Sequence, residues 1–212
     1  QMTERVFEVS ALAVRERVAF EARGDKRIDK RSGVSQRLPI SVLEHAISSA
    51  ERRALVYGEP VVVPRVSDIY MALPSITGKI ELEYEGELQG GEAIAKELIR
   101  RAAGATMEER LGDIALDQIV TWFDGGGALK VKGDEKSESC VKGFGMVPGL
   151  VDAAVAGGLA ERGDAPVIVS ACELILEGLA SEKRISRSEE LGYVRARPER
   201  REPGQGKGLS FG

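Results

Sequence analysis

Apolar residues recur at helical spacing along most of this chain. Residues 9–23 alternate apolar and charged positions as an amphipathic helix does. Residues 40–57 carry apolar side chains at i, i+3 and i+4 spacing, with charged side chains largely opposite, and Gly58 predicts the end of that helix. The same pattern predicts five further helices, at 67–74, 92–103, 111–124, 146–161 and 165–186.

Three segments are harder to assign. Residues 79–88 alternate Ile, Leu and Tyr with glutamate, which fits a strand or a helix with acidic flanks. Gly104 predicts a turn after the helix at 92–103. Residues 193–212 are rich in Arg, Gly and Pro, so we expect an irregular tail there.

The predicted fold class is therefore mostly α, with six to eight helices and at most a small β element. We expect a helical bundle over residues 1–89, followed by a second helical domain over 90–212 that ends in the irregular basic tail. The polar connector at 125–139 is the other possible boundary.

Composition narrows the class of protein. Of 212 residues 42% are hydrophobic and only 5% aromatic, so Leu, Ile, Val and Ala must form the core. The formal net charge of −4 argues against nucleic-acid binding, and acidic residues interleave the basic ones near the C-terminus. No apolar run approaches the roughly 20 residues of a membrane span. We expect a cytoplasmic protein in which Cys140 and Cys172 are reduced, with no membrane or nucleic-acid partner.

Most common chemistries have no support in the sequence. His45 is the only histidine and has no second ligand at metal spacing, so we expect a surface residue and neither a metal site nor a Ser-His-Asp triad. The stretch at 203–210 resembles a P-loop, but Gly208 follows Lys207 where Ser or Thr is required. Asp124 is better explained as a helix end than as a metal-holding acid.

Residues 32–41 pose the main functional question. Ser35 could cap a helix that begins at Gln36, or Ser41 could cap it with Glu44 completing a capping box. Under either alternative Arg37 lies at the mouth of a long helix. It could bind an anion there, or pair with a glutamate of the same domain.

Residues 24–59 read GDKRIDKRSGVSQRLPISVLEHAISSAERRALVYGE. The charged run, the Gly-Val-Ser-x-Arg motif and the Ala-rich helix ending in AERRAL resemble the helical lid of AAA+ ATPases. The resemblance is to the magnesium-chelatase I-subunit-like branch, which is related to the MoxR-type regulators. It is most specific over residues 26–100 and weaker beyond them.

The resemblance implies a nucleotide-sensing role for Arg37. In that lid the Ser-x-Arg at a helix start supplies the sensor-2 arginine, which reaches the γ-phosphate of ATP. A guanidinium suits this task because it is permanently charged and binds phosphate oxygens in a bidentate manner. The resemblance also implies ATP and Mg²⁺ as cofactors, a ring of subunits, and coupling of hydrolysis to a protein partner.

The chain lacks other parts of that family pattern. It contains no P-loop, Walker B acid pair or arginine finger, and Gln1 precedes Met2, which is not how translation starts. We therefore expect a piece of a longer protein that contacts its own AAA+ core and is inactive alone, without bound cofactor. The alternative is a non-enzymatic helical interaction or regulatory module.

Overall fold

The computed structural model describes residues 11–29, 31, 34–188 and 190–196. Over these residues the chain is mostly helical, with one small antiparallel sheet, as predicted. The elements, in chain order, are α2 (Ala11–Gly24), α3 (Leu38–Tyr57), α4 (Val66–Tyr70), α5 (Leu73–Thr77), α6 (Tyr84–Gln89), α7 (Gly91–Leu111), α8 (Asp117–Asp124), α9 (Ser137–Phe144), α10 (Leu150–Ala156), α11 (Ala165–Ser181), β1 (Ile185–Ser188) and β2 (Gly192–Arg195). The described residues thus form ten helices rather than six to eight, because α5, α6 and α9 are additional short helices.

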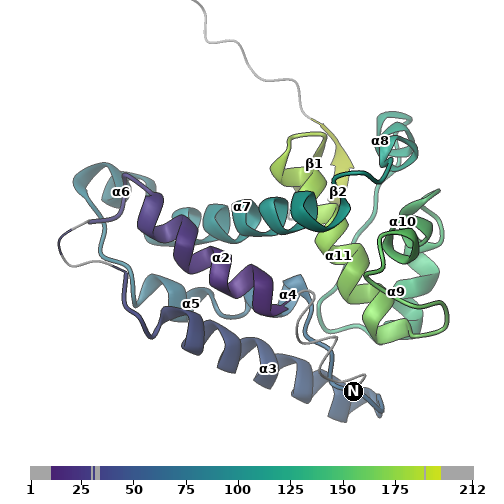
Figure 1. The fold of residues 1–212 in the computed structure, drawn as a ribbon, viewed down its shortest axis with the longest axis horizontal. Helices are drawn as coiled ribbons and strands as arrows, with labels where there is room; N and C mark the ends of the chain where they lie inside the picture. Colours follow the sequence, from purple (N-terminus) through teal and green to yellow (C-terminus); the bar gives the residue numbers. More distant parts are fainter. Residues whose placement is uncertain (1–10, 30, 32–33, 189, 197–212) are drawn as a thin grey trace, which may run out of the picture.

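Helix α11 lies at the centre of the fold (Figure 1). Every residue from Val167 to Ala180 is buried, and the helix packs against α4, α7, α9, α10 and β1. Its sequence is mostly apolar, as expected for a helix without a solvent face, and its polar side chains Ser170, Glu173 and Glu177 are buried as well. Pro166 occupies the first turn, as predicted, and the side chain of Asp164 accepts a hydrogen bond from the Val167 N–H.

Helix α7 joins the two halves of the chain because it packs against both α2 and α11. The predicted turn at Gly104 is wrong, since α7 runs unbroken to Leu111. A Cβ at Gly104 would lie 2.5 Å from Ser181 Oγ, so the glycine permits close approach to α11 rather than a turn. The apolar core is continuous across the predicted boundary at residues 89–90, and the division into two domains stays a prediction.

Helix α3 begins at Leu38, with Pro39 in its first turn and Arg37 at the N-cap position. Both alternatives for the helix start are wrong, because Gln36 lies before the helix and Ser41 lies inside it. Ser35 is not the N-cap residue but accepts a hydrogen bond from the Arg37 N–H ahead of the helix. Gly58 ends the helix as predicted, in a left-handed conformation with φ 64° that glycine adopts without strain.

The β structure corrects the expectation for residues 193–195 and resolves the alternatives for residues 79–88. Strands β1 and β2 pair from Ile185↔Arg195 to Ser188↔Gly192, so residues 193–195 are strand rather than irregular tail. The rest of the predicted tail, 197–212, lies outside the described residues. Residues 79–88 combine both alternatives, since Leu82 forms a bridge with Ile28 and α6 follows directly.

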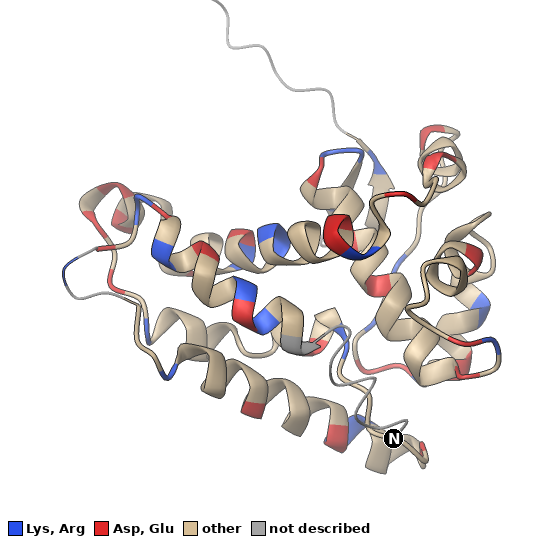
Figure 2. Ribbon diagram, in the orientation of Figure 1, with Lys and Arg blue, Asp and Glu red and all other residues tan. Residues whose placement is uncertain are grey.

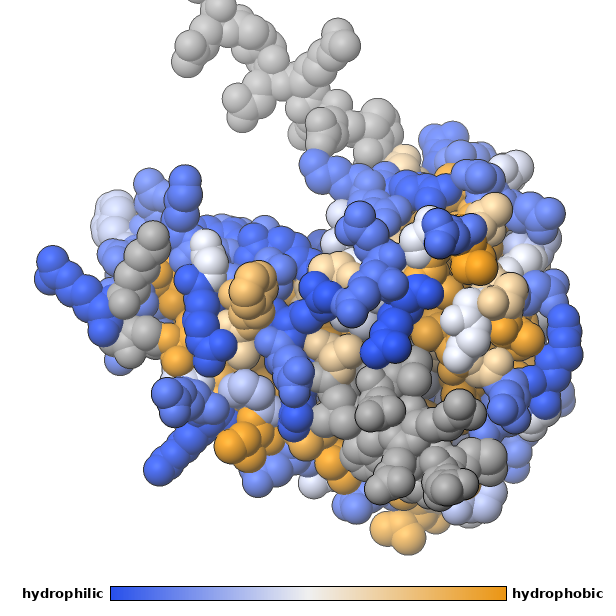
Figure 3. All heavy atoms as spheres, viewed as in Figure 1, coloured by the Kyte–Doolittle hydropathy of each residue, from blue (hydrophilic) through white to orange (hydrophobic). Residues whose placement is uncertain are grey.

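The surface carries mixed charge and limited apolar area. Over the described residues, basic and acidic side chains are interspersed along the helices (Figure 2). The face in Figure 3 is mostly hydrophilic, with hydrophobic side chains in smaller patches. Within the described ranges, no helix has the length and apolar character needed to cross a bilayer.

Candidate functional site

Arg37 lies at the solvent-exposed start of the 20-residue helix α3. Leu38 and Val42 are both fully buried, and they anchor this first turn in the core. The Arg37 backbone N–H donates to Ser35 Oγ over 3.2 Å, and the Leu38 N–H donates to the Ser35 carbonyl over 2.9 Å. The two serine contacts fix the backbone at Arg37 and leave its side chain projecting from a rigid helix end.

The Arg37 guanidinium has no hydrogen-bond or ion-pair partner among the described residues. The alternative in which Arg37 pairs with a glutamate is thus not found there. Neighbouring Arg31 is also exposed, while Lys30 lies outside the described residues. An exposed guanidinium at the N-terminal, positive end of a helix dipole is an arrangement that attracts anions.

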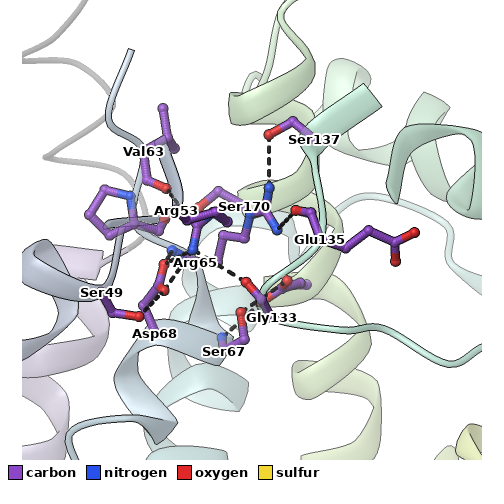
Figure 4. A network of polar contacts seen from close by, with 12 residues as sticks. Ser49, Arg53, Val63, Arg65, Ser67, Asp68, Gly133, Glu135, Ser137 and Ser170 are labelled. Carbon is purple, nitrogen blue, oxygen red and sulfur yellow. Dashed lines mark hydrogen bonds and ion pairs between the residues drawn. The ribbon is translucent and has the colours of Figure 1, made fainter. Parts of the chain in front are cut away.

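The other end of α3 belongs to a network of buried arginines and carboxylates (Figure 4). Arg53 Nη1 donates to both oxygens of Asp68, over 2.6 and 2.8 Å, and both side chains are at most 4% exposed. Ser49 Oγ donates to Asp68 Oδ1 over 2.7 Å, and Arg53 Nη2 donates to the Val63 carbonyl over 2.8 Å. These bonds fasten α3 to α4 and to the segment before it.

Arg65 continues the network into the C-terminal half. Its side chain is 1% exposed and donates to the Glu135 carbonyl over 3.0 Å and to Ser137 Oγ over 2.8 Å (Figure 4). Glu59 Oε1 lies 3.9 Å from Arg65 Nη2 and accepts a hydrogen bond from the Ser137 N–H over 2.8 Å. Arg65 therefore connects the start of α4 to the start of α9.

Helix α4 is also held by α11. Glu173 accepts hydrogen bonds from the N–H and hydroxyl of Ser67, over 2.8 and 3.2 Å. Full burial raises the pKa of Glu173 above its usual range, although Arg65 and Ser67 act in the opposite direction. Ser170 Oγ donates to the Pro64 carbonyl over 2.7 Å, so two polar contacts from α11 flank the Arg65 network.

Sequence reasoning missed this network because arginine is normally placed at the surface. A partial signal was present: Arg53 follows Ala50 and Ala46 at helical spacing, on the face that proves to be buried. Leu55, one of the apolar residues in the predicted helix at 40–57, is instead 84% exposed. A second signal was Asp68 at the third position of α4, where it accepts a hydrogen bond from the Arg65 N–H over 2.8 Å.

The remaining candidate residues are accounted for by local contacts. His45 is exposed on α3 as predicted, and its Nδ1 lies 2.9 Å from the Ser41 carbonyl oxygen. Among the described residues, no three His, Cys, Asp or Glu side chains gather as a metal site would require. Cys140 and Cys172 are free and buried, and burial raises the pKa of Cys140 to about 11 and that of Cys172 further.

No protein-family model matches the chain, and no curated protein or solved structure matches it either. Function must therefore be inferred from the residues and contacts of this chain.

Proposed function

We propose that this chain is the lid and C-terminal region of a chelatase-like AAA+ ATPase, and that Arg37 is its nucleotide-sensing residue. ATP and Mg²⁺ would be held mainly by a P-loop core outside this chain. Arg37 would contact the γ-phosphate across the boundary between core and lid. Hydrolysis would remove that contact and release the lid.

The single observation that supports this role is the Arg37 guanidinium at the start of α3, which is exposed and has no partner among the described residues. A structural arginine would be expected to make the contacts that buried Arg53 and Arg65 make. Arg37 instead keeps its five N–H donors available for a phosphate. The N-terminal end of the α3 dipole adds a favourable potential for an anion at the same position.

The Arg53–Asp68 pair gives α3 a means of passing on a change at its N-terminus. Because α3 is fixed to α4 by buried charged hydrogen bonds, a displacement of α3 moves α4 with it. Arg65 then relays the movement to the start of α9. The lid would respond to nucleotide as one rigid unit rather than through bending of α3.

The test is ATP hydrolysis by the complete polypeptide that contains this chain. Arg37→Ala should lower kcat by at least about tenfold, because a charge-assisted hydrogen bond to phosphate contributes roughly 1.5–3 kcal/mol. Arg37→Lys should recover only part of the loss, since lysine lacks the bidentate geometry. Arg52→Ala, which removes an exposed arginine from the same helix, is the matched control and should hydrolyse ATP normally. Unchanged turnover and nucleotide affinity in Arg37→Ala would refute the proposal.

A second candidate, a non-enzymatic interaction module, is favoured by the apolar end of α3. Leu55 is 84% and Val56 69% exposed, and Tyr57 follows them. Adjacent exposed apolar side chains of this size commonly mark a contact with another protein. The same ATPase measurement separates the two candidates, since an interaction module predicts no ATP turnover at all.

A further inference from the structure

A cavity of about 410 Å³ lies on the side of α4 that faces α11, and neither Arg53 nor Asp68 lines it. Its walls come from α4, α7, α11, the β1–β2 hairpin and residues 130–131. Figure 1 shows the hairpin standing beside α7 and α11, where these elements meet. Arg37 is not among the lining residues, so this site is separate from the proposed nucleotide contact.

The Glu177 carboxylate in the cavity already has hydrogen-bond and ion-pair partners within the protein. Glu177 is fully buried and accepts hydrogen bonds from the Tyr70 hydroxyl over 2.7 Å and the Tyr193 hydroxyl over 2.8 Å. Arg187 forms an ion pair with the same carboxylate and stacks over the Tyr70 ring at 4.2 Å. Arg187 thus neutralises the charge of Glu177, so this carboxylate does not require a cationic ligand.

The remaining charge of the cavity is positive. Four cationic side chains line it, those of Lys96, Arg100, Lys130 and Arg187, against the carboxyl groups of Glu173 and Glu177. This excess is local, because the chain as a whole has a formal net charge of −4. Burial also raises the pKa of Glu173, which favours its neutral form and increases the positive excess.

Two of these cations have no ion-pair partner in the part of the chain that the structure describes. Arg100 is half-buried, its Nε atom is buried without a hydrogen bond, and no described residue forms an ion pair with its guanidinium. Lys130 is exposed at the cavity and likewise has no ion-pair partner within the described ranges. Lys96 differs, since its ammonium pairs with Glu92 at 2.8 Å.

We propose that this cavity binds a small organic phosphate, with its phosphate group held by Arg100 and Lys130. A phosphate dianion matches the two unpartnered cations in charge, and a guanidinium binds two of its oxygens in parallel. The cavity is of the size that small-molecule sites commonly have, so room remains beside the phosphate for an organic group. The inference does not depend on the role of Arg37.

The test is titration of the isotope-labelled full chain with inorganic phosphate, followed by amide NMR and calorimetry. Saturable shifts are expected at residues 66–70, 96–100, 130–131, 187–188 and 192–193. Any shifts at residues 34–41 would report binding at Arg37 and are fitted separately. Sodium chloride at equal ionic strength should not reproduce them. The melting temperature should rise with phosphate concentration as binding to the folded state requires.

Arg100→Gln should weaken phosphate binding about tenfold or more, and Lys130→Gln should weaken it in the same direction. Arg110→Gln is the matched control, because Arg110 is an exposed arginine on the same helix outside the cavity. Since Lys130 is exposed, Lys130→Gln remains informative if Arg100→Gln does not fold. Equal affinity in the Arg100 and Arg110 variants, or shifts that chloride reproduces, would overturn the proposal.

Discussion

Asp25 is the clearest case of a single residue whose charge state contributes to folding. Its buried carboxylate accepts hydrogen bonds from Arg27, at 2.9 and 2.6 Å, and from Arg101 at 2.8 Å. Hydrogen bonding by the Arg27 side chain, aided by the positive charges of both arginines, holds the pKa of Asp25 well below its usual range. The ionised form is therefore bound more favourably in the folded chain than in the unfolded one.

This linkage predicts a pH-dependent difference between the wild type and Asp25→Asn. A lowered folded-state pKa stabilises the fold fully above the unfolded value of about 3.9, and that stabilisation is lost as the pH falls below it. Urea unfolding should show the variant clearly less stable at pH 7, with the gap narrowing between about pH 4 and pH 2. Asp113→Asn, at an exposed aspartate without an ion pair among the described residues, should show no such trend. A gap of constant size across this range would contradict the assignment.

For individual residues, the sequence allowed some exposed positions to be predicted but not the contacts of buried polar side chains. His45 could be assigned to the surface because no second metal ligand lies at suitable spacing. For Arg37 the sequence left two alternatives open, an anion site and a pair with a glutamate. The partners of Arg65 lie more than 70 residues away in some cases, at Ser137 for example. Only tertiary packing brings such groups together, so no local sequence pattern could predict these hydrogen bonds.

The crossing of α7 and α11 depends on glycines at the contact. A Cβ at Gly178 would lie 2.3 Å from Met107 Sδ and 2.7 Å from Met107 Cβ. Gly104 makes the reciprocal contact with Ser181 from the other helix. The two helices thus approach more closely than larger residues would permit.

Gly178→Ala should destabilise the fold although alanine favours helices. The propensity gain is about 1 kcal/mol, whereas overpacking a core contact costs about 1–3 kcal/mol. Chemical unfolding should therefore show a net loss of roughly 1 kcal/mol. Gly24→Ala is the control, since Gly24 ends α2 with open space around its Cβ position, and it should be neutral or stabilising. A Gly178→Ala variant at least as stable as the wild type would show that Met107 moves aside freely.

Long helices were predictable from periodicity, and their junctions were not. The segments of α3, α8 and α11 emerge from apolar spacing alone, with Gly58 and Pro166 marking ends. The turn predicted at Gly104 is wrong because the sequence does not distinguish a glycine needed for close helix packing from one needed for a turn. Strand β2 was missed because its pairing with β1 and the bridge from Leu129 to Tyr193 supply the structure, rather than its own Arg-rich sequence.

At the scale of the whole molecule, Arg65 connects the two halves of the chain through buried hydrogen bonds, in addition to the packing of α7. This one side chain contacts the backbone of Glu135 and the hydroxyl of Ser137, while its own backbone begins α4. Without it the segment before α9 would keep the Glu59 contact and lose its charged anchor.

Arg65→Met should loosen the α9 end of the molecule selectively. Hydrogen exchange should quicken by about tenfold or more at residues 133–141, because charged hydrogen bonds contribute roughly 1.5–3 kcal/mol. Amides of α2 should exchange nearly as in the wild type. Arg52→Met, at an exposed position, should leave both regions unchanged. A uniform increase over all helices would mean that Arg65 supports global stability and not this connection.

The central position of α11 also has a consequence for synthesis on the ribosome. The helix that α7, α9 and α10 pack against is the last helix in chain order among the described residues. At about 5–20 residues per second, roughly 4 to 14 s separate the making of Leu111 from that of Ser181. Throughout that interval the face of α7 that packs on α11 lacks this partner, so we expect it to stay exposed or bound by a chaperone until α11 has been made.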